Sequence, residues 1–103
     1  MNITISIRAE FGSHLADGSA AAHFRMGRID PYVDICPEII LDFTGVRNAN
    51  SSFINALVAG MVEQHGVEVL QKTVFQGCNP AIRVLVEAAV DLGVSKIGGR
   101  VVA

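Results

Sequence analysis

The hydrophobic positions of this chain follow two periods, one typical of strands and one typical of helices. Ile3, Ile5 and Ile7 alternate with polar residues, which predicts an edge or antiparallel strand with one buried face. Residues 38–43 form an almost continuous apolar run, as in a central strand that is covered on both faces. A third strand is predicted at residues 73–76.

Two stretches between these strands have helical spacing. Asp17 is a good N-cap, and the Ala-rich residues after it predict a helix over about residues 19–29. Residues 52–65 are apolar over so broad a face that a helix there is expected to pack against a sheet. Gly66 stands where a helix C-cap is expected.

The last helix has the clearest signals. Asn79 is placed as its cap, Pro80 as its first residue, and Gly93 as its end. Residues 94–103 are then expected to form a short strand or a flexible tail. Strands that alternate with helices in this order predict an α/β fold with right-handed crossovers.

Composition narrows the class of protein. The 103 residues fit one domain, and 50% of them are apolar against 17% charged, with a mean hydropathy of +0.43. Charges at Asp42, Glu63 and Arg83 interrupt the apolar runs before they reach the roughly 18 residues of a membrane span. The apolar excess indicates a covered sheet and an apolar patch for a partner. A net charge of −2 argues against binding to nucleic acid.

The expected location is the cytoplasm. The first residues lack the basic start and the apolar core of a signal peptide. Cys36 and Cys78 show no metal-ligand spacing and are expected to be free, buried thiols in a reducing compartment.

The start of the second helix is the candidate functional region. Residues 44–50 form a predicted turn, and Ser51 and Ser52 follow at the helix entrance. The first N–H groups of a helix lack partners and carry the positive end of its dipole. Either one of Asn50, Ser51 and Ser52 simply caps this helix, or the position holds a phosphate group.

These residues resemble a known signature. The segment Leu41-Asp42-Phe43-Thr44-Gly45-Val46, followed by Asn50-Ser51-Ser52, resembles the STAS domain of the anti-sigma factor antagonists, in which an Asp-Ser-Ser-Gly motif opens a helix after a strand and a turn. The closer similarity is to the STAS-like family of bacterial domains of unknown function, and it extends from Ile39 to Asn79-Pro80 and the last helix. It implies a STAS-like fold, a small mixed sheet with helices packed on it, as a single domain over residues 1–103.

The resemblance also implies a role for one serine. In phosphoregulated STAS proteins, a partner kinase that is also the anti-sigma factor phosphorylates the serine after the acidic residue, which places the candidate phosphoacceptor at Ser51. Two positions depart from that pattern, because Asn50 replaces the acidic residue and Phe53 replaces the glycine. Asparagine has no carboxylate to assist a proton transfer, and phenylalanine fills space that a partner would approach. The acidic pair often found in the STAS-like family is replaced by Asn55-Ala56.

Catalytic and metal chemistry find little support in the sequence. Ser51 lacks the Gly-x-Ser-x-Gly elbow of serine hydrolases. The histidines lie far apart, at His14, His23 and His65. We therefore expect no enzyme activity, no cofactor and no metal site. Asp42 is unusual in an apolar strand and needs a partner, for which Arg47 and the turn N–H groups are the candidates.

The leading hypothesis is a non-enzymatic regulatory domain that binds another protein. The expected contact residues lie in the turn and the helix start, at Asn48, Asn50, Ser51, Ser52 and Asn55. The resemblance implies that the partner is a histidine-kinase-like ATPase or an anti-sigma-type kinase. The alternative is a small-ligand or nucleotide-binding module that uses the helix entrance at residues 50–53. Membrane and nucleic-acid partners are not expected, and the oligomeric state, a homodimer included, is left open.

Overall fold

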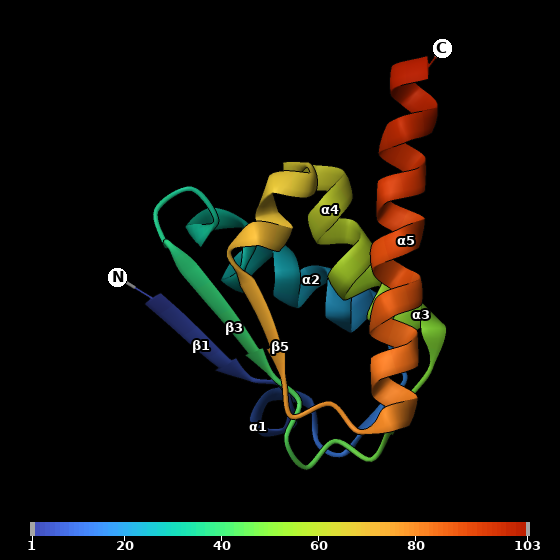
Figure 1. The fold of residues 1–103 in the computed structure, drawn as a ribbon. Helices are drawn as coiled ribbons and strands as arrows, with labels where there is room; N and C mark the ends of the chain where they lie inside the picture. Colours follow the sequence, from blue (N-terminus) through green and yellow to red (C-terminus); the bar gives the residue numbers. More distant parts are fainter. Residues whose placement is uncertain (1, 103) are drawn as a thin grey trace.

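Three parallel strands form the main sheet of the chain. The structure is a computed structural model that describes residues 2–102, with side chains described over residues 2–97. The strands are β1 (Asn2–Ser6), β3 (Glu38–Asp42) and β5 (Thr73–Gln76), in the order β1-β3-β5 (Figure 1). A second, two-stranded parallel sheet pairs β2 (His14–Leu15) with β4 (Asn48–Ala49).

The α/β class expected from the sequence is confirmed, but the expected mixed sheet is not observed. All strand pairs in the described residues are parallel, including β1 with β3 and β3 with β5. Helical segments connect β1 to β3 and β3 to β5, so the chain returns to the same end of the sheet before each strand starts. The first strand is an edge strand, as predicted, and it is parallel to its neighbour.

The first strand is shorter than the alternation of isoleucines suggested. It ends at Ser6, whose Oγ accepts a hydrogen bond from the N–H of Ala9 (3.2 Å). Ser6 is therefore the N-cap of a short helix, α1 (Ile7–Phe11), which the sequence analysis did not predict. Ile7 is buried at the start of this helix rather than at the end of a strand.

The predicted helix near residue 19 is α2 (Gly18–Arg28), and Asp17 is its N-cap, as expected. The Oδ1 atom of Asp17 accepts a hydrogen bond from the N–H of Ala20 (3.1 Å). A 3₁₀ turn, η1 (Asp30–Tyr32), follows α2.

The predicted helix over residues 52–65 is confirmed, with one irregularity. It consists of α3 (Ser51–Ile54), a π-helical turn η2 (Asn55–Ala59) and α4 (Gly60–His65). Gly66 ends it with φ +83°, a conformation that favours glycine, as the sequence indicated. The 3₁₀ segment η3 (Val67–Gln71) then leads into β5.

The final helix, α5 (Pro80–Val102), begins as predicted but does not end at Gly93. A Cβ atom at Gly93 would lie 2.8 Å from the Cβ of Val62 and 3.2 Å from the carbonyl oxygen of Ala59. The glycine therefore permits close packing of α5 against η2 and α4, and it does not end the helix. Residues 94–102 are helical, so the expected short strand is not formed. In the described part of the chain, no helix is both long and apolar enough to cross a membrane.

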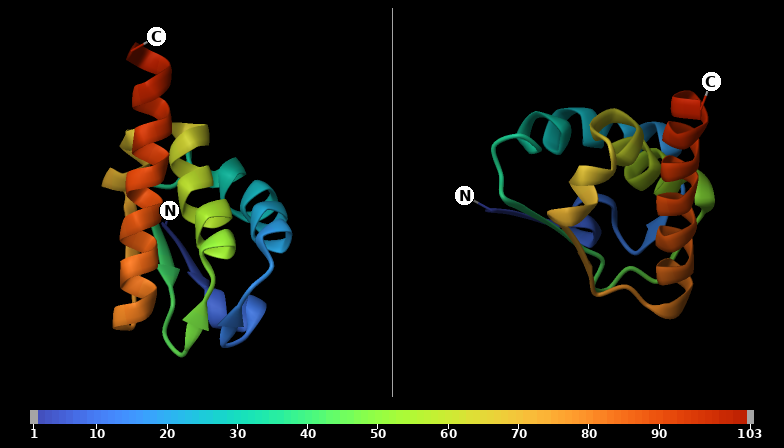
Figure 2. Two further views of the ribbon diagram at one scale, coloured as in Figure 1. Left: turned by 90° about the vertical axis from the view of Figure 1, so that its right-hand side faces the viewer. Right: turned by 45° about the horizontal axis from the view of Figure 1, so that its top comes forward.

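The helices α2 to α4, which connect the strands, lie on one side of the main sheet, and α5 stands beyond its β5 edge (Figures 1 and 2). This follows from the strand order, because right-handed crossovers between successive neighbouring strands place every connection on the same face. Thr4, Ile40 and Val74 form a row on the opposite face, and no element in residues 2–102 covers them. The central strand is thus covered on one face only, where the apolar run at residues 38–43 predicted two.

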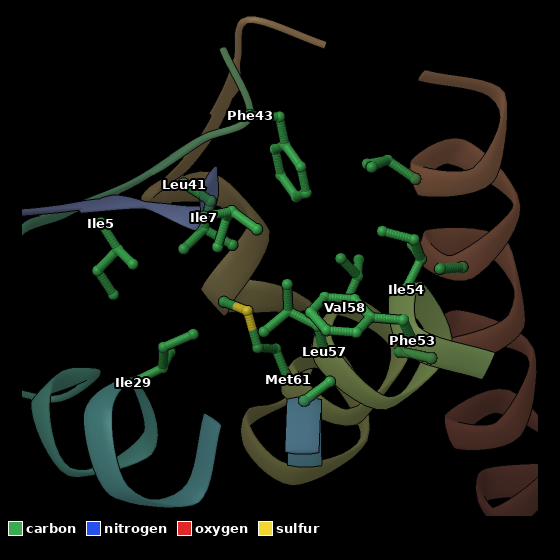
Figure 3. Packing of buried hydrophobic residues seen from close by; sticks show 14 of the residues in the cluster. Ile5, Ile7, Ile29, Leu41, Phe43, Phe53, Ile54, Leu57, Val58 and Met61 are labelled. Atoms are coloured by element: carbon green, nitrogen blue, oxygen red, sulfur yellow. The ribbon is translucent and has the colours of Figure 1, made fainter. Parts of the chain in front are cut away.

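The hydrophobic core fills the space between the sheet and the helices. Leu41 and Phe43 project from the sheet side, and Phe53, Leu57 and Met61 meet them from the helix that contains the π turn (Figure 3). All five side chains are almost fully buried. The helix start at residue 51 is therefore held on a rigid base.

Replacing Gly93 by alanine is expected to lower the free energy of unfolding by about 1–3 kcal/mol, because the new methyl group collides with Val62. Gly27 is the matched control, since it also lies in a helix but has no atom within 4 Å of the position of an added Cβ. Gly27→Ala should raise stability by about 0.5–1 kcal/mol through helix propensity. Urea unfolding measures both. A stabilised Gly93→Ala variant would contradict the close-packing explanation.

Candidate functional site

Asn50 forms the entrance of helix α3. Its Oδ1 accepts a hydrogen bond from the N–H of Phe53 (2.9 Å), which makes it the N-cap. Its Nδ2 donates to the carbonyl of Ala16 (2.8 Å), and its backbone N–H donates to the carbonyl of Leu15 (2.8 Å). The side chain thus works as an acceptor and as a donor, and an ionised aspartate could only accept. This explains why asparagine fits here, where the resembling motif has an acidic residue.

Ser51 and Ser52 are the first two residues of α3, and both are exposed. Because Asn50 is the cap, neither serine is needed for that role. Ser52 lies against the start of α2, since a Cβ atom at Gly18 would come within 2.4 Å of its Oγ. The N-termini of α2 and α3 are therefore neighbours, and the positive ends of two helix dipoles meet beside the serines.

The other predicted contact residues differ in accessibility. Asn48 is exposed, and its Oδ1 lies 2.7 Å from Nδ1 of His14 on the paired strand β2. Asn55 is half-buried at the first position of the π turn. Four of the five residues thus share one exposed surface, here called the helix-entrance surface: Asn48, Asn50, Ser51 and Ser52.

A polar network that no sequence pattern indicated connects α2 to the π turn and to the end of α4. Arg25 donates from Nε to the carbonyl of Ala56 in the π turn (3.0 Å) and from Nη1 to Oδ2 of Asp30 (2.6 Å). The other oxygen of Asp30 lies 2.7 Å from Nε2 of His65. The three side chains are only 13–16% exposed. A Cβ atom at Gly60 would lie 2.6 Å from Arg25 Nε, so the glycine makes room for the guanidinium.

This network explains the irregular helix turn. A π turn disturbs the regular backbone hydrogen bonds, and Arg25 supplies a donor to a carbonyl within it. The partners lie 5, 31 and 35 residues apart in the sequence. Two of these separations are far longer than any local pattern, so no sequence signal indicated that Arg25 would meet Ala56 or that Asp30 would meet His65.

Of the two candidate partners of Asp42, the turn N–H groups are confirmed and Arg47 is not. The Oδ1 atom of Asp42 accepts hydrogen bonds from the N–H (2.9 Å) and the hydroxyl (2.6 Å) of Thr44. These bonds, with a smaller contribution from the side chain of Gln76, lower the pKa of the carboxyl group below its ordinary value of 3.8, against a small opposing effect of burial. Asp42 is compatible with the apolar strand because it points to the uncovered face of the sheet.

A polar hollow of about 590 Å³ opens where β1 and β3 end. The residues that line it include Ser6, Arg8, Ser13, Asp42 and Thr44. Small ligands in open α/β sheets commonly bind at the carboxyl ends of the strands. The hollow offers a guanidinium and a carboxylate to a small polar molecule, at a place that the sequence analysis did not identify.

The histidines and cysteines form no metal cluster in the part of the chain that the structure describes. No three His, Cys, Asp or Glu side chains there are grouped to hold a metal ion. Cys36 is buried and Cys78 half-buried, and both are free thiols, as predicted. Burial raises the pKa of the Cys78 thiol, and the positive charge of Arg83 only partly opposes this. Less thiolate is therefore present at neutral pH, which makes Cys78 a weak nucleophile.

Comparison with known proteins identifies the family. The family model described as a STAS-like domain of unknown function (DUF4325) matches residues 20–83. The matched range starts within α2, ends within the first turns of α5, and contains the whole helix-entrance surface. No curated protein and no solved structure matches the chain.

Replacing Asn50 by aspartate is expected to lower the free energy of unfolding by about 1 kcal/mol, because the bond to the carbonyl of Ala16 is lost while the cap is kept. Asn50→Ala should cost more, about 2 kcal/mol, because it loses both interactions. Ser51→Ala, the matched control, should change stability by less than about 0.5 kcal/mol. Urea unfolding of the three variants tests this. If Ser51→Ala proved as damaging as Asn50→Ala, the assignment of the cap would be wrong.

An NMR titration should show that the pKa of the Asp42 carboxyl group lies below 3.8. Thr44→Val should raise this pKa, because it removes the hydroxyl donor. A carboxylate with a lowered pKa stabilises the folded state fully above the pKa of the unfolded chain, and this stabilisation is lost as the pH falls through the lower folded value. The stability difference between the wild type and Thr44→Val should therefore be largest above about pH 4 and shrink in more acidic solution. A constant difference across this range would contradict the role of Thr44.

Proposed function

This chain belongs to the family of STAS-like domains of unknown function, and we propose that it is a non-enzymatic regulatory domain that binds another protein through its helix-entrance surface. The partner is a histidine-kinase-like ATPase of the anti-sigma type, and Ser51 is the residue that this partner phosphorylates. The domain acts in the cytoplasm, where its two free thiols stay reduced.

The exposure of Ser51 is the observation that carries this proposal. Asn50 caps the helix, so Ser51 is left at the surface without a capping role, on a helix that is anchored in the core. A phosphoryl group adds a charge of about −1.5 to −2, which the adjacent N-termini of α2 and α3 would stabilise. Phosphorylation would thus leave the fold intact and place negative charge in the contact surface of the partner.

The surroundings of Ser51 support binding rather than catalysis. Asn50 is held by the carbonyl of Ala16 and by the N–H of Phe53, and Asn48 is held by His14. These side chains position the backbone around the serine. Catalysis by a serine of this chain would need a base of the chain that is hydrogen-bonded to its hydroxyl, whereas in the proposed phosphorylation the partner kinase supplies the base. The imidazole of His14, on the strand paired with β4, is bonded to Asn48 and not to Ser51.

The direct test uses the histidine-kinase-like ATPase whose gene lies nearest to that of this chain, with ATP and Mg²⁺. Ser51→Glu should weaken binding at least about tenfold by adding negative charge to the interface. Asn55→Arg should weaken it by placing a bulky cation at the edge of that interface. Ser51→Ala should keep binding and abolish phosphorylation, measured by intact mass. The matched control is Ser95→Glu, an exposed serine on α5. Unchanged binding by both Ser51→Glu and Asn55→Arg would refute the proposed interface.

The small-ligand alternative makes a different prediction. ATP, ADP and inorganic phosphate should produce no saturable rise in melting temperature if the domain binds only protein. A saturable rise that Ser51→Glu abolishes would favour a ligand site at residues 50–53. A rise that Arg8→Ala abolishes would instead locate the ligand in the polar hollow at the ends of β1 and β3.

A further inference from the structure

Strand β5 is an edge of the main sheet with unused hydrogen-bonding groups. The N–H of Ile39 donates to the carbonyl of Lys72 (2.7 Å), and the N–H of Phe43 donates to that of Gln76 (2.8 Å). In a parallel ladder only every second residue bonds to a given neighbour. Thr73 and Phe75 therefore direct their backbone N–H and C=O groups away from β3. Among the strands that the structure describes, none pairs with this side of β5.

A groove runs between this edge and helix α5. It consists of two adjoining hollows of about 340 and 430 Å³, both lined by Phe75, Val86 and Glu87. Val90 and Asp91 extend the lining along the helix. The groove exists because α5 packs against η2 and α4, through the close approach at Gly93, rather than against β5. Figure 1 shows α5 beyond the β5 edge of the sheet, on the side away from β3.

The four residues of β5 include no charged residue and no proline. Proteins commonly shield edge strands with an outward lysine, a proline or a bulge. The nearest lysine, Lys72, is instead turned inward, where its Nζ donates to the carbonyls of Val33 and Cys36. Val74, in the middle of the strand, is 39% exposed.

We propose that the free edge of β5 binds an extended segment of a partner protein as an added strand. Main-chain hydrogen bonds to Thr73 and Phe75 would hold the segment, and its apolar side chains would contact Val86 and Val90. Glu87 and Asp91 are both exposed on the helix wall of the groove, and Arg83, one turn before Glu87, lines only the hollow nearer the start of α5. The complementary segment therefore carries lysine or arginine at the alternate positions that lie opposite Glu87 and Asp91. This surface is separate from the helix-entrance surface, and the proposal does not depend on the phosphorylation of Ser51.

The charge of the groove argues against a second copy of this chain as the occupant. A β5 strand from another copy would bring no basic side chain, because its sequence is Thr-Val-Phe-Gln. The groove-lining part of its α5 would bring Glu87 and Asp91 with only Arg83 to offset them, so that part of the helix adds no net positive charge either. Like charges in a shared interface disfavour association.

The test uses the full-length, ¹⁵N-labelled chain and three synthetic peptides as probes. One peptide alternates valine with lysine, one alternates valine with glutamate, and the third is the first with a central proline. The lysine peptide should slow hydrogen exchange of the Thr73 and Phe75 amides at least about tenfold. The amide of Thr4, on the opposite edge strand β1, should be unaffected. The proline peptide should bind at least about tenfold more weakly, because it lacks a main-chain donor.

The role of the acidic side chains in the groove is tested by reversing their charge. Glu87→Lys with Asp91→Lys should shift the preference from the lysine peptide to the glutamate peptide. The control, Glu10→Lys with Asp34→Lys, makes the same change in net charge outside the groove lining and should keep the original preference. The proposal is wrong if the lysine and proline peptides bind equally well, or if hydrogen exchange of the Thr73 and Phe75 amides is not slowed. It is also wrong if the charge-reversed variant still prefers the lysine peptide. The peptide comparisons on the wild-type chain decide it even if a variant fails to fold.

Discussion

Strand β3 pairs in parallel with β1 on one side and β5 on the other, and the rest of the molecule depends on this arrangement. Because the strands follow one another in sequence order, right-handed crossovers bring the connecting helices to one face of the sheet. The core therefore forms between that face and the helix that contains the π turn. The other face stays uncovered, and it accommodates Asp42 within an otherwise apolar strand.

At the helix-entrance surface, the residue that stabilises the fold is not one of the serines that are exposed to a partner. Asn50 caps α3 and ties it to the carbonyl of Ala16, so the fold does not need the hydroxyls of Ser51 and Ser52. Arg25 reinforces the same helix one turn further on by bonding to Ala56 in the π turn. A rigid base under exposed serines suits a surface that another protein must recognise with fixed geometry.

The two proposed surfaces have different physical characters. The helix-entrance surface offers hydroxyls and the positive ends of two helix dipoles, which favour an added phosphate. The groove along β5 offers main-chain groups, an apolar wall and the acidic side chains of Glu87 and Asp91. One surface suits a switch that works by charge, and the other suits an extended basic segment. A domain with both could bind two partners, or two parts of one partner.

The sequence alone determined the features that depend on neighbouring residues. Local patterns revealed three helix boundaries: the cap at Asp17, the end at Gly66 and the start at Asn79-Pro80. Each of them depends on hydrogen bonds or dihedral angles within a few residues. The family resemblance at residues 39–53 was likewise readable, and the location of the candidate surface followed from it. Tertiary structure decided what Gly93, Asp42 and Arg25 do. Gly93 is needed because Val62 approaches closely, and Asp42 is tolerated because one face of the sheet is uncovered. Arg25 bonds to a carbonyl and a carboxylate on separate elements. These roles depend on distances between segments far apart in the chain, and such distances exist only once the sheet and helices have packed together.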